Sequence, residues 1–157
     1  VDAFLAEVAA LYEGASQRVE LRLAATDLVV EADPVRLRQV IHNLLKNALE
    51  AVGQQGHVVI ESLSGEEAGR RFVEIHVDDN GRGFDPDLIN QVFEPYVTSK
   101  IKGTGLGLAI VKRIVAEHGG MIRAENPPAG GGRVLVRLPA FVERAAVPAS
   151  NLGGASV

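Results

Sequence analysis

The stretch DPVRLRQVIHNLLKNALEAVG, residues 33–53, predicts a long amphipathic helix that ends at about Val52. Asp33 is a favourable N-cap residue, and Pro34 suits the first helical position because the N–H that it lacks has no helical partner there. Gly53 is typical of a residue that ends a helix. At about 100° per residue the apolar side chains gather on one arc, and they are Leu37, Ile41, Leu44, Leu45, Ala48 and Val52. This arc is expected to cover a buried core.

Three polar residues lie beside the arc, because Asn43, Asn47 and Glu50 follow one another at intervals of one helical turn. Asparagine is a poor helix former, and a buried amide has to find hydrogen-bond partners. One interpretation is an ordinary solvated helix face. The other is that the amide oxygens face a ligand, since a neutral oxygen can coordinate Mg²⁺ without repelling a bound phosphate. The helix alone leaves both interpretations open.

The segments around this helix predict a mixed α/β domain. Helical spacing occurs in residues 1–16 and from about 104 to 118, and a short helix is expected after Asp85-Pro86. Strands are expected at residues 18–23, 28–30, 57–63, 71–78, 121–125 and 133–138, with a polar turn over residues 64–70. Because helices and strands do not alternate regularly, we expect an α/β (α+β) two-layer sandwich, with a mixed sheet covered on one face by helices.

The composition excludes several classes of function. The chain has 157 residues, a net charge of -4 and 4% aromatic residues, so it lacks the basic surface and the stacking platforms of nucleic-acid-binding proteins. It has no cysteine, which rules out disulfides, thiolate metal sites and cysteine nucleophiles. No apolar run is long enough to cross a membrane, and the N-terminus lacks a signal-peptide pattern. We expect a cytoplasmic domain that makes no membrane contact itself, although its parent protein could be membrane-anchored.

A second polar motif is DNGRG, residues 79–83, which directly follows the apolar strand expected at residues 71–78. It could be a simple tight turn, because Asp, Asn and Gly are the commonest turn residues. Alternatively, Asp79 accepts a hydrogen bond from an amino group of a buried base, and Gly81 and Gly83 let the backbone approach that base closely. A carboxylate accepts but cannot donate, so it would favour adenine over guanine.

A third motif is GTGLGL, residues 103–108, which opens the helix expected from about residue 104 to 118. A Gly-rich loop at a helix N-terminus offers unpaired N–H groups and the positive end of the helix dipole to a phosphate, although it could also be a flexible hinge. Lys100 and Lys102 precede the motif and could meet distal phosphates. It is not a Rossmann fingerprint, because Leu108 takes the place of the last glycine, and no P-loop motif occurs in the chain.

Between these two motifs lies Phe93-Glu94-Pro95-Tyr96, whose aromatic residues could anchor a loop to the core or one end of a lid. Each motif alone is weak evidence, but their order is specific. Over residues 18–139 the chain resembles the ATP-binding superfamily shared by sensor histidine kinases, DNA gyrase B, the Hsp90 chaperones and the MutL repair proteins. Residues 43–48 resemble the histidine kinase N box, residues 79–83 the G1 box, residues 93–96 the F box and residues 103–108 the G2 box. The stretch from 93 to 120 particularly resembles nitrogen-regulation sensor kinases.

The resemblance implies a mixed sheet of about five strands packed on three main helices, with a mobile ATP lid between the F and G2 boxes. It implies ATP and Mg²⁺ as ligands, with Asn47 coordinating the metal and Asp79 reading the adenine amine. No residue is assigned as a general base, while Asn43 and Lys100 would support phosphoryl transfer. The expected nucleotide-binding residues are Asn43, Asn47, Asp79, Gly81, Gly83, Phe93, Lys100, Lys102, Gly103, Thr104, Gly105, Leu106, Gly107 and Leu108.

One position separates the branches of this superfamily. In the gyrase, Hsp90 and MutL branches, a glutamate one helical turn before the metal asparagine activates water. Here that position is Asn43, and an amide cannot act as a general base at neutral pH. The resemblance therefore implies a kinase with slow intrinsic ATP hydrolysis.

Two positions depart from the histidine kinase pattern: Glu50 stands where a Lys or Arg is frequent, and Ala51 stands where an aromatic residue stacks on adenine. Two alternatives to the kinase stay open, and these departures bear on the second of them. One is an ATPase of the gyrase or MutL kind, with Glu50 or Glu94 as its base. The other is a degenerate nucleotide site that serves as a docking module.

The phospho-accepting histidine of the family lies in a helical motif of His-Glu followed by Asn-Pro, and none of His42, His57, His76 and His118 has that context. We expect residues 17–140 to be the catalytic domain, residues 1–16 a linker helix or the end of a missing dimerisation domain, and residues 141–157 a disordered tail. The resemblance implies that the γ-phosphoryl group goes to a histidine on the dimerisation and phosphotransfer domain of the same parent protein. It also implies a response regulator downstream and a monomeric fragment.

Overall fold

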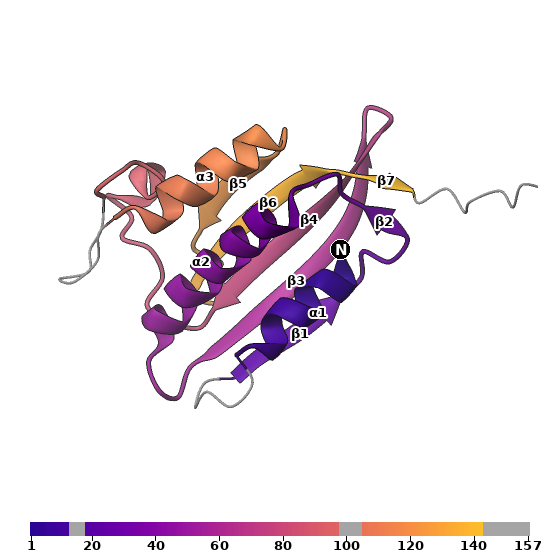
Figure 1. The fold of residues 1–157 in the computed structure, drawn as a ribbon. Coiled ribbons are helices and arrows are strands. Elements are labelled where there is room, and N and C mark those ends of the chain that lie inside the picture. Colours follow the sequence, from indigo (N-terminus) through magenta and orange to yellow (C-terminus); the bar gives the residue numbers. More distant parts are fainter. Residues whose placement is uncertain (13–17, 98–104, 143–157) are drawn as a thin grey trace, which may run out of the picture.

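The computed structural model describes residues 1–12, 18–97 and 105–142, which form a five-stranded mixed sheet and helices on one of its faces (Figure 1). The α-helices are α1 (Asp2–Ala10), α2 (Pro34–Val52) and α3 (Gly107–Glu117), and η1 (Ile89–Gln91) is a short 3-10 helix. The expected two-layer sandwich, with about five strands and three main helices, is confirmed.

The sheet has the strand order β1-β3-β4-β6-β5. These strands are β1 (Arg18–Leu23), β3 (His57–Glu67), β4 (Arg70–Asp79), β6 (Gly132–Pro139) and β5 (Met121–Glu125). β1 runs parallel to β3, and the other neighbouring strands are antiparallel. β4 therefore lies in the middle of the sheet, and its C-terminal end leads directly into residues 79–83.

Helix α2 begins and ends where the sequence indicates. The Asp33 carboxylate accepts hydrogen bonds from the N–H groups of Val35 at 2.9 Å and Arg36 at 3.3 Å, and Pro34 is the first helical residue. Gly53 ends the helix with a φ of 66°, a left-handed value that glycine adopts without steric cost. These two ends set the length of the helix, and its apolar arc sets which residues face the sheet.

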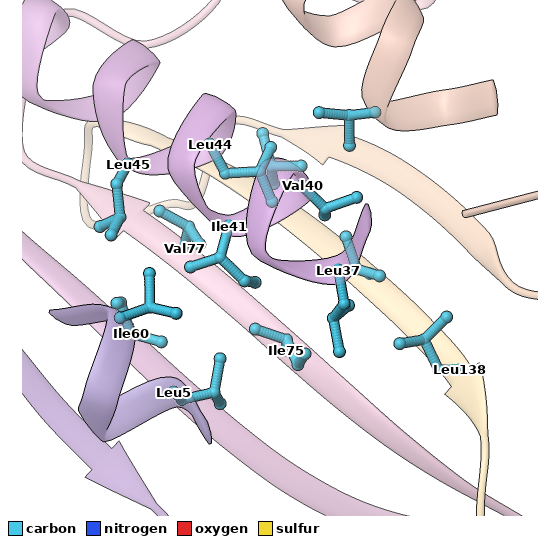
Figure 2. Packing of buried hydrophobic residues seen from close by; sticks show 14 of the residues in the cluster. Leu5, Leu37, Val40, Ile41, Leu44, Leu45, Ile60, Ile75, Val77 and Leu138 are labelled. Carbon is cyan, nitrogen blue, oxygen red and sulfur yellow. The ribbon is translucent and has the colours of Figure 1, made fainter. Parts of the chain in front are cut away.

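The core lies between the helices and the sheet (Figure 2). The predicted arc of α2 is buried except for the half-buried Val52. It packs over strand residues such as Ile60, Ile75 and Leu138, and Leu5 of α1 joins the same cluster. This packing holds α2 over the sheet, so the polar residues on its flank have a fixed position relative to the end of β4.

The hairpin of β3 and β4 is longer than expected, and the prediction of a polar turn over residues 64–70 is wrong. The turn consists of Ala68 and Gly69, with φ values of 50° and 75°, and the residues on either side of it are paired in the two strands. Positive φ at both central residues is what a two-residue type I′ hairpin turn requires. The strand ends escaped prediction because they are largely exposed on both faces, so no apolar alternation marks them.

The two ends of the described chain are tied to the domain. Helix α1 contributes to the same core as α2, with Leu5 and Val8 both 0% exposed, and whether α1 counts as a linker helix stays a prediction. Phe141 and Val142 form β7, which pairs with β2 (Leu28–Val29). The tail expected to be disordered from residue 141 thus begins with two residues in a strand, while residues 143–157 lie outside the described part.

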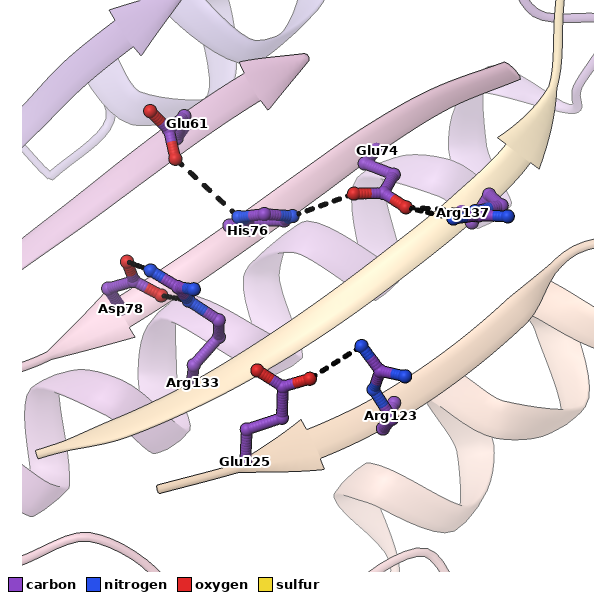
Figure 3. A network of polar contacts seen from close by, with 8 residues as sticks. All are labelled: Glu61, Glu74, His76, Asp78, Arg123, Glu125, Arg133 and Arg137. Carbon is purple, nitrogen blue, oxygen red and sulfur yellow. Dashed lines mark hydrogen bonds and ion pairs between the residues drawn. The ribbon is translucent and has the colours of Figure 1, made fainter. Parts of the chain in front are cut away.

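The outer face of the sheet carries charged side chains paired across neighbouring strands (Figure 3). Arg137 of β6 lies opposite Glu74 of β4, with 2.6 Å between Nη2 and Oε1, and Arg133 lies opposite Asp78, with 2.6 Å between Nε and Oδ1. A face of this kind is typical of an antiparallel sheet that meets water on one side. Among the described helices, none is long and apolar enough to cross a bilayer.

Candidate functional site

A cavity of about 710 Å³ opens where the C-terminal half of α2 meets the loop after β4 and the start of α3. Its lining brings together four residues expected from the sequence, Asn47, Asp79, Gly83 and Leu108. The remaining lining residues are Glu50, Ala51, Arg82, Phe84, Asp85, Pro86, Leu88, Val92 and Val97. Segments distant in sequence therefore meet at one hollow, whose lining combines polar and apolar side chains.

The two asparagines of α2 have different surroundings. Asn47 lines the cavity, one turn before Ala51, and is half-buried. Asn43 does not line it, and its Nδ2 lies 3.4 Å from the backbone oxygen of Gly107, to which it donates a long hydrogen bond. Asn43 thus links α2 to the first residue of α3, and Asn47 is the amide that faces the cavity.

Asp79 is oriented by the backbone around it. Its Oδ1 accepts a hydrogen bond from the N–H of Gly81 at 2.9 Å and a longer one from the N–H of Gly132 at 3.4 Å. The first contact follows from the turn that begins as β4 ends, since an Asp side chain often bonds to the backbone two residues later. The second comes from β6, so backbone groups from two parts of the chain hold the carboxylate in the lining of the cavity.

The glycines of residues 79–83 are required by close packing. A Cβ atom at Gly81 would lie 2.5 Å from the backbone oxygen of Ala51, so the loop presses against the end of α2. Gly83 has a φ of 78°, and a Cβ there would lie 2.7 Å from both Asn126 Oδ1 and the oxygen of Gly131. Gly83 lines the cavity and Gly81 does not; Gly81 shapes the site by bringing the loop close to α2.

The start of α3 contributes one side chain to the lining, that of Leu108. Gly107 is the first residue of the helix, and Leu106 caps it without a side-chain hydrogen bond. Gly105 has a φ of 68°, and its backbone oxygen accepts a hydrogen bond of 2.9 Å from the N–H of Tyr96. The expected phosphate-binding residues Lys100, Lys102, Gly103 and Thr104, and with them the expected lid, lie outside the described residues.

Phe93 is half-buried and packs against the core, and it does not line the cavity. Its neighbours Val92 and Val97 do line it. The aromatic residue at this position thus acts as an anchor for the segment that carries the two valines.

Sequence reasoning missed the contribution of the connection between β5 and β6. Asn126 bonds to the backbone of Phe84, and Gly131 approaches Asp79 so closely that a Cβ atom would lie 1.8 Å from its backbone oxygen. The signal in the sequence is the cluster ENPPAGGG at residues 125–132, which marks a turn but not its distant contacts. The apolar wall formed by Phe84, Pro86 and Leu88 was also not foreseen.

Known proteins are similar to this chain in sequence and fold. The chain matches the family of histidine kinase-, DNA gyrase B- and HSP90-like ATPases over residues 32–141. It is 39% identical over 131 residues to the sensor histidine kinase ZraS of Salmonella typhi, an alignment that covers 82% of this chain and 28% of ZraS. It is 44% identical over 106 residues to an NtrY-like sensor histidine kinase of Rickettsia bellii, covering 68% of this chain and 17% of that protein.

The solved structures agree with the sequence relatives. The catalytic domain of histidine kinase ThkA has a TM-score of 0.78 at 33% identity, covering 88% of this chain and 91% of that domain. A complex of ThkA with the response regulator TrrA has a TM-score of 0.73 at 31% identity, covering 92% of this chain and 42% of that kinase chain.

The chain therefore belongs to the histidine kinase-, DNA gyrase B- and HSP90-like ATPase family, and it is the ATP-binding catalytic domain of a sensor histidine kinase of two-component signalling. The family expected from the order of the motifs is confirmed. The chain spans 28% of the length of ZraS.

Proposed function

We propose that this domain binds Mg-ATP in the cavity between α2, the loop after β4 and α3. From there it supplies the γ-phosphoryl group to a histidine on a separate dimerisation and phosphotransfer domain of its parent protein. The observation that carries the proposal is the meeting of Asn47, Asp79 and Gly83 in the lining of one cavity. An amide oxygen, a carboxylate and a side-chain-free backbone are the groups that a metal-bound adenine nucleotide needs.

Asp79 is proposed to select the base. Its carboxylate can accept a hydrogen bond from the exocyclic amine of adenine. Guanine has an oxygen at that position, and two acceptors cannot form a hydrogen bond with each other. Because backbone N–H groups already orient Oδ1, the carboxylate needs no rearrangement before it binds. The apolar wall of Phe84, Pro86 and Leu88 can cover the base in place of the aromatic residue that Ala51 does not provide.

The residues present fit a Mg²⁺ ion that arrives with the nucleotide. Mg²⁺ prefers oxygen ligands, keeps several waters and is often bound through phosphates and one or two protein groups. Asn47 offers an amide oxygen at the cavity, and no group of three or more His, Asp or Glu side chains able to hold a metal occurs in the described part of the chain. The ion would supply neutralisation of the phosphate charge during transfer.

The charges of the described lining residues favour the base over the phosphates. Within residues 18–97 and 105–142, the lining includes the carboxylates of Glu50, Asp79 and Asp85 and one guanidinium, that of Arg82. The phosphates are therefore proposed to lie toward the N-terminus of α3, where backbone N–H groups and the helix dipole favour anions. Lys100 and Lys102 would join them there.

The domain is proposed to transfer phosphate rather than to hydrolyse ATP rapidly. Asn43 occupies the position from which an acidic residue would activate water, and its amide is hydrogen-bonded to Gly107. Transfer to a histidine presented by another domain needs mainly positioning and charge stabilisation. ThkA has been solved with a response regulator, and we propose a response regulator as the next acceptor for the parent of this chain.

The test combines a binding assay with a transfer assay on Asn47→Ala. Without the amide oxygen, we expect the affinity for ATP in the presence of Mg²⁺ to fall about tenfold or more, which corresponds to about 1.4 kcal/mol, while metal-free binding changes little. Calorimetry measures the binding, and labelled ATP with the parent's separately purified phosphotransfer domain measures the transfer. Gln39→Ala, an exposed amide on the same helix, is the matched control. Equal binding and transfer by Asn47→Ala and the control would contradict the proposal.

A further inference from the structure

Asn126 makes a two-sided contact with the backbone of the nucleotide loop. It follows β5, on the connection to β6, and lies 42 residues from its partner Phe84. Its Oδ1 accepts a hydrogen bond of 2.7 Å from the N–H of Phe84, and its Nδ2 donates one of 2.8 Å to the backbone oxygen of Phe84. One side chain thus satisfies both backbone groups of one residue, as a neighbouring strand would.

This contact fixes the part of the loop that lines the cavity. Phe84 and its neighbours Gly83, Asp85 and Pro86 all belong to the lining, whereas Asn126 does not. A Cβ at Gly83 would lie 2.7 Å from Asn126 Oδ1, and a Cβ at Gly132 would lie 3.2 Å from the ring of Phe84. The loop is therefore held between Asn126 on its backbone and the start of β6 beside its ring.

We propose that Asn126 is a positioning residue for nucleotide binding: it touches no nucleotide, but it holds Phe84 and the adjoining backbone in the conformation that receives the base. The role rests on the proposed function of the cavity. It adds a residue that lies outside the four sequence boxes and on a different part of the sheet.

An asparagine suits this role because it offers one acceptor and two donors on one planar group. An ionised aspartate at the same position could accept from the N–H of Phe84 but would set a carboxylate against its backbone oxygen. A protonated aspartate would regain the donor. Asn126→Asp therefore makes the proposed contact depend on pH, whereas the defect of Asn126→Ala should not depend on the protonation of residue 126.

The first test compares Asn126→Ala with the wild-type chain by calorimetry of ADP and ATP binding. We expect the Kd to rise about fivefold to tenfold, because the free protein must order the loop on binding. Gln55→Ala removes an amide from an exposed turn outside the cavity lining, and we expect it to leave the Kd unchanged. Wild-type affinity in a folded Asn126→Ala chain would overturn the proposal.

The second test follows Asn126→Asp from about pH 8 to about pH 4, where an aspartate with an ordinary pKa is about half protonated. We expect its Kd relative to wild type at the same pH to be raised at the upper end and to fall toward wild type at the lower end. A ratio that stays constant across this range would overturn the positioning role. A wild-type chain that binds no adenine nucleotide would overturn the proposed function itself, and this role with it.

Discussion

The carboxylate of Asp79 shows how much of the site depends on a single side chain held by main-chain groups. Its hydrogen bonds from Gly81 and Gly132 come from two different parts of the chain. Both bonds use Oδ1, which an asparagine could replace with its amide oxygen, so Asp79→Asn removes the charge and keeps an acceptor for these two contacts. The base-reading role can therefore be tested separately from the structural role.

For Asp79→Asn we expect the affinity for ATP to fall about tenfold to a hundredfold, because a hydrogen bond to a charged acceptor contributes about 1.5–3 kcal/mol. The preference for ATP over GTP should shrink, since an amide can donate to the oxygen of guanine. Calorimetry with both nucleotides measures the change, and circular dichroism checks the fold. Asp87→Asn, at an exposed position outside the lining, serves as the control. An unchanged Kd for ATP would rule out the base-reading role.

At this scale the sequence predicts the site only where function is carried by local motifs. Asn47, Asp79 and Gly83 stand in short patterns whose residue types match a nucleotide site, and all three line the cavity. Asn126 could not be found in this way, because its partner Phe84 is 42 residues distant and no periodicity connects them. Asn43 was grouped with Asn47 by helical spacing alone, which cannot show that its amide turns toward Gly107.

Among the elements, β4 carries two different faces. Its inward side chains form the core, and its outward ones form ion pairs with β3 and β6 (Figure 3). Burial alone would raise the pKa of the Glu74 carboxyl, but hydrogen bonds from Arg137 and His76 outweigh it, and the net pKa is lowered. A lowered pKa in the folded state means that the ionised form stabilises the fold above the unfolded pKa, and that this contribution is lost as the pH falls through the folded pKa.

We therefore expect the melting temperature of the wild-type chain to fall as the pH drops below about 4.5. Glu74→Gln should lower the melting temperature near neutral pH, by the equivalent of about 1 kcal/mol, and the difference from wild type should narrow in acid. Thermal melts across the pH series measure this. Glu66→Gln removes a carboxylate from an ion pair with Arg71 in which the two side chains are 57% and 50% exposed, and it should have little effect on the melting temperature. If the melting temperatures of Glu74→Gln and wild type differed by the same amount at every pH, the stabilising role of the ionised Glu74 carboxylate would be contradicted.

The elements themselves were largely foreseeable. α2 was predicted with both of its ends because an N-cap, a proline and a glycine mark them. The hairpin turn was placed too broadly because exposed strand ends carry no apolar alternation. β7 was missed because two exposed residues after Pro139 give no periodic signal, and only their pairing with β2 defines them as a strand.

For the whole molecule, helix α1 is packed into the same core as α2 and the sheet. Helix α1 buries Leu5 and Val8 among the residues of α2 and the sheet. Its first residue, Asp2, also accepts hydrogen bonds from Ser62 Oγ at 2.6 Å and from the N–H of Ala25 at 3.1 Å. The sequence showed an amphipathic helix here but could not show what it packs against, because amphipathic spacing is the same for a linker and for a core helix.

If α1 belongs to the same cooperative unit, Leu5→Ala should destabilise the entire domain by about 2–5 kcal/mol, as expected for a fully buried leucine. Unfolding in urea measures this, with circular dichroism and nucleotide binding as two separate signals. The midpoints of both transitions should shift together. Leu11→Ala, at a position that is 64% exposed near the end of the same helix, should change stability little. A local loss of helix with an unchanged main transition would instead identify α1 as a separate linker.

The hydrogen bond between the N–H of Tyr96 and the oxygen of Gly105 brings two points of the backbone together on either side of residues 97–104. Because this bond holds Tyr96 and Gly105 side by side, the number of residues between them need not affect where α3 begins. Closing a longer loop costs only about 0.6 kcal/mol for each doubling of its length. The length of residues 98–104 can thus change while the start of α3 and the described lining of the cavity, which includes Val97, keep their geometry.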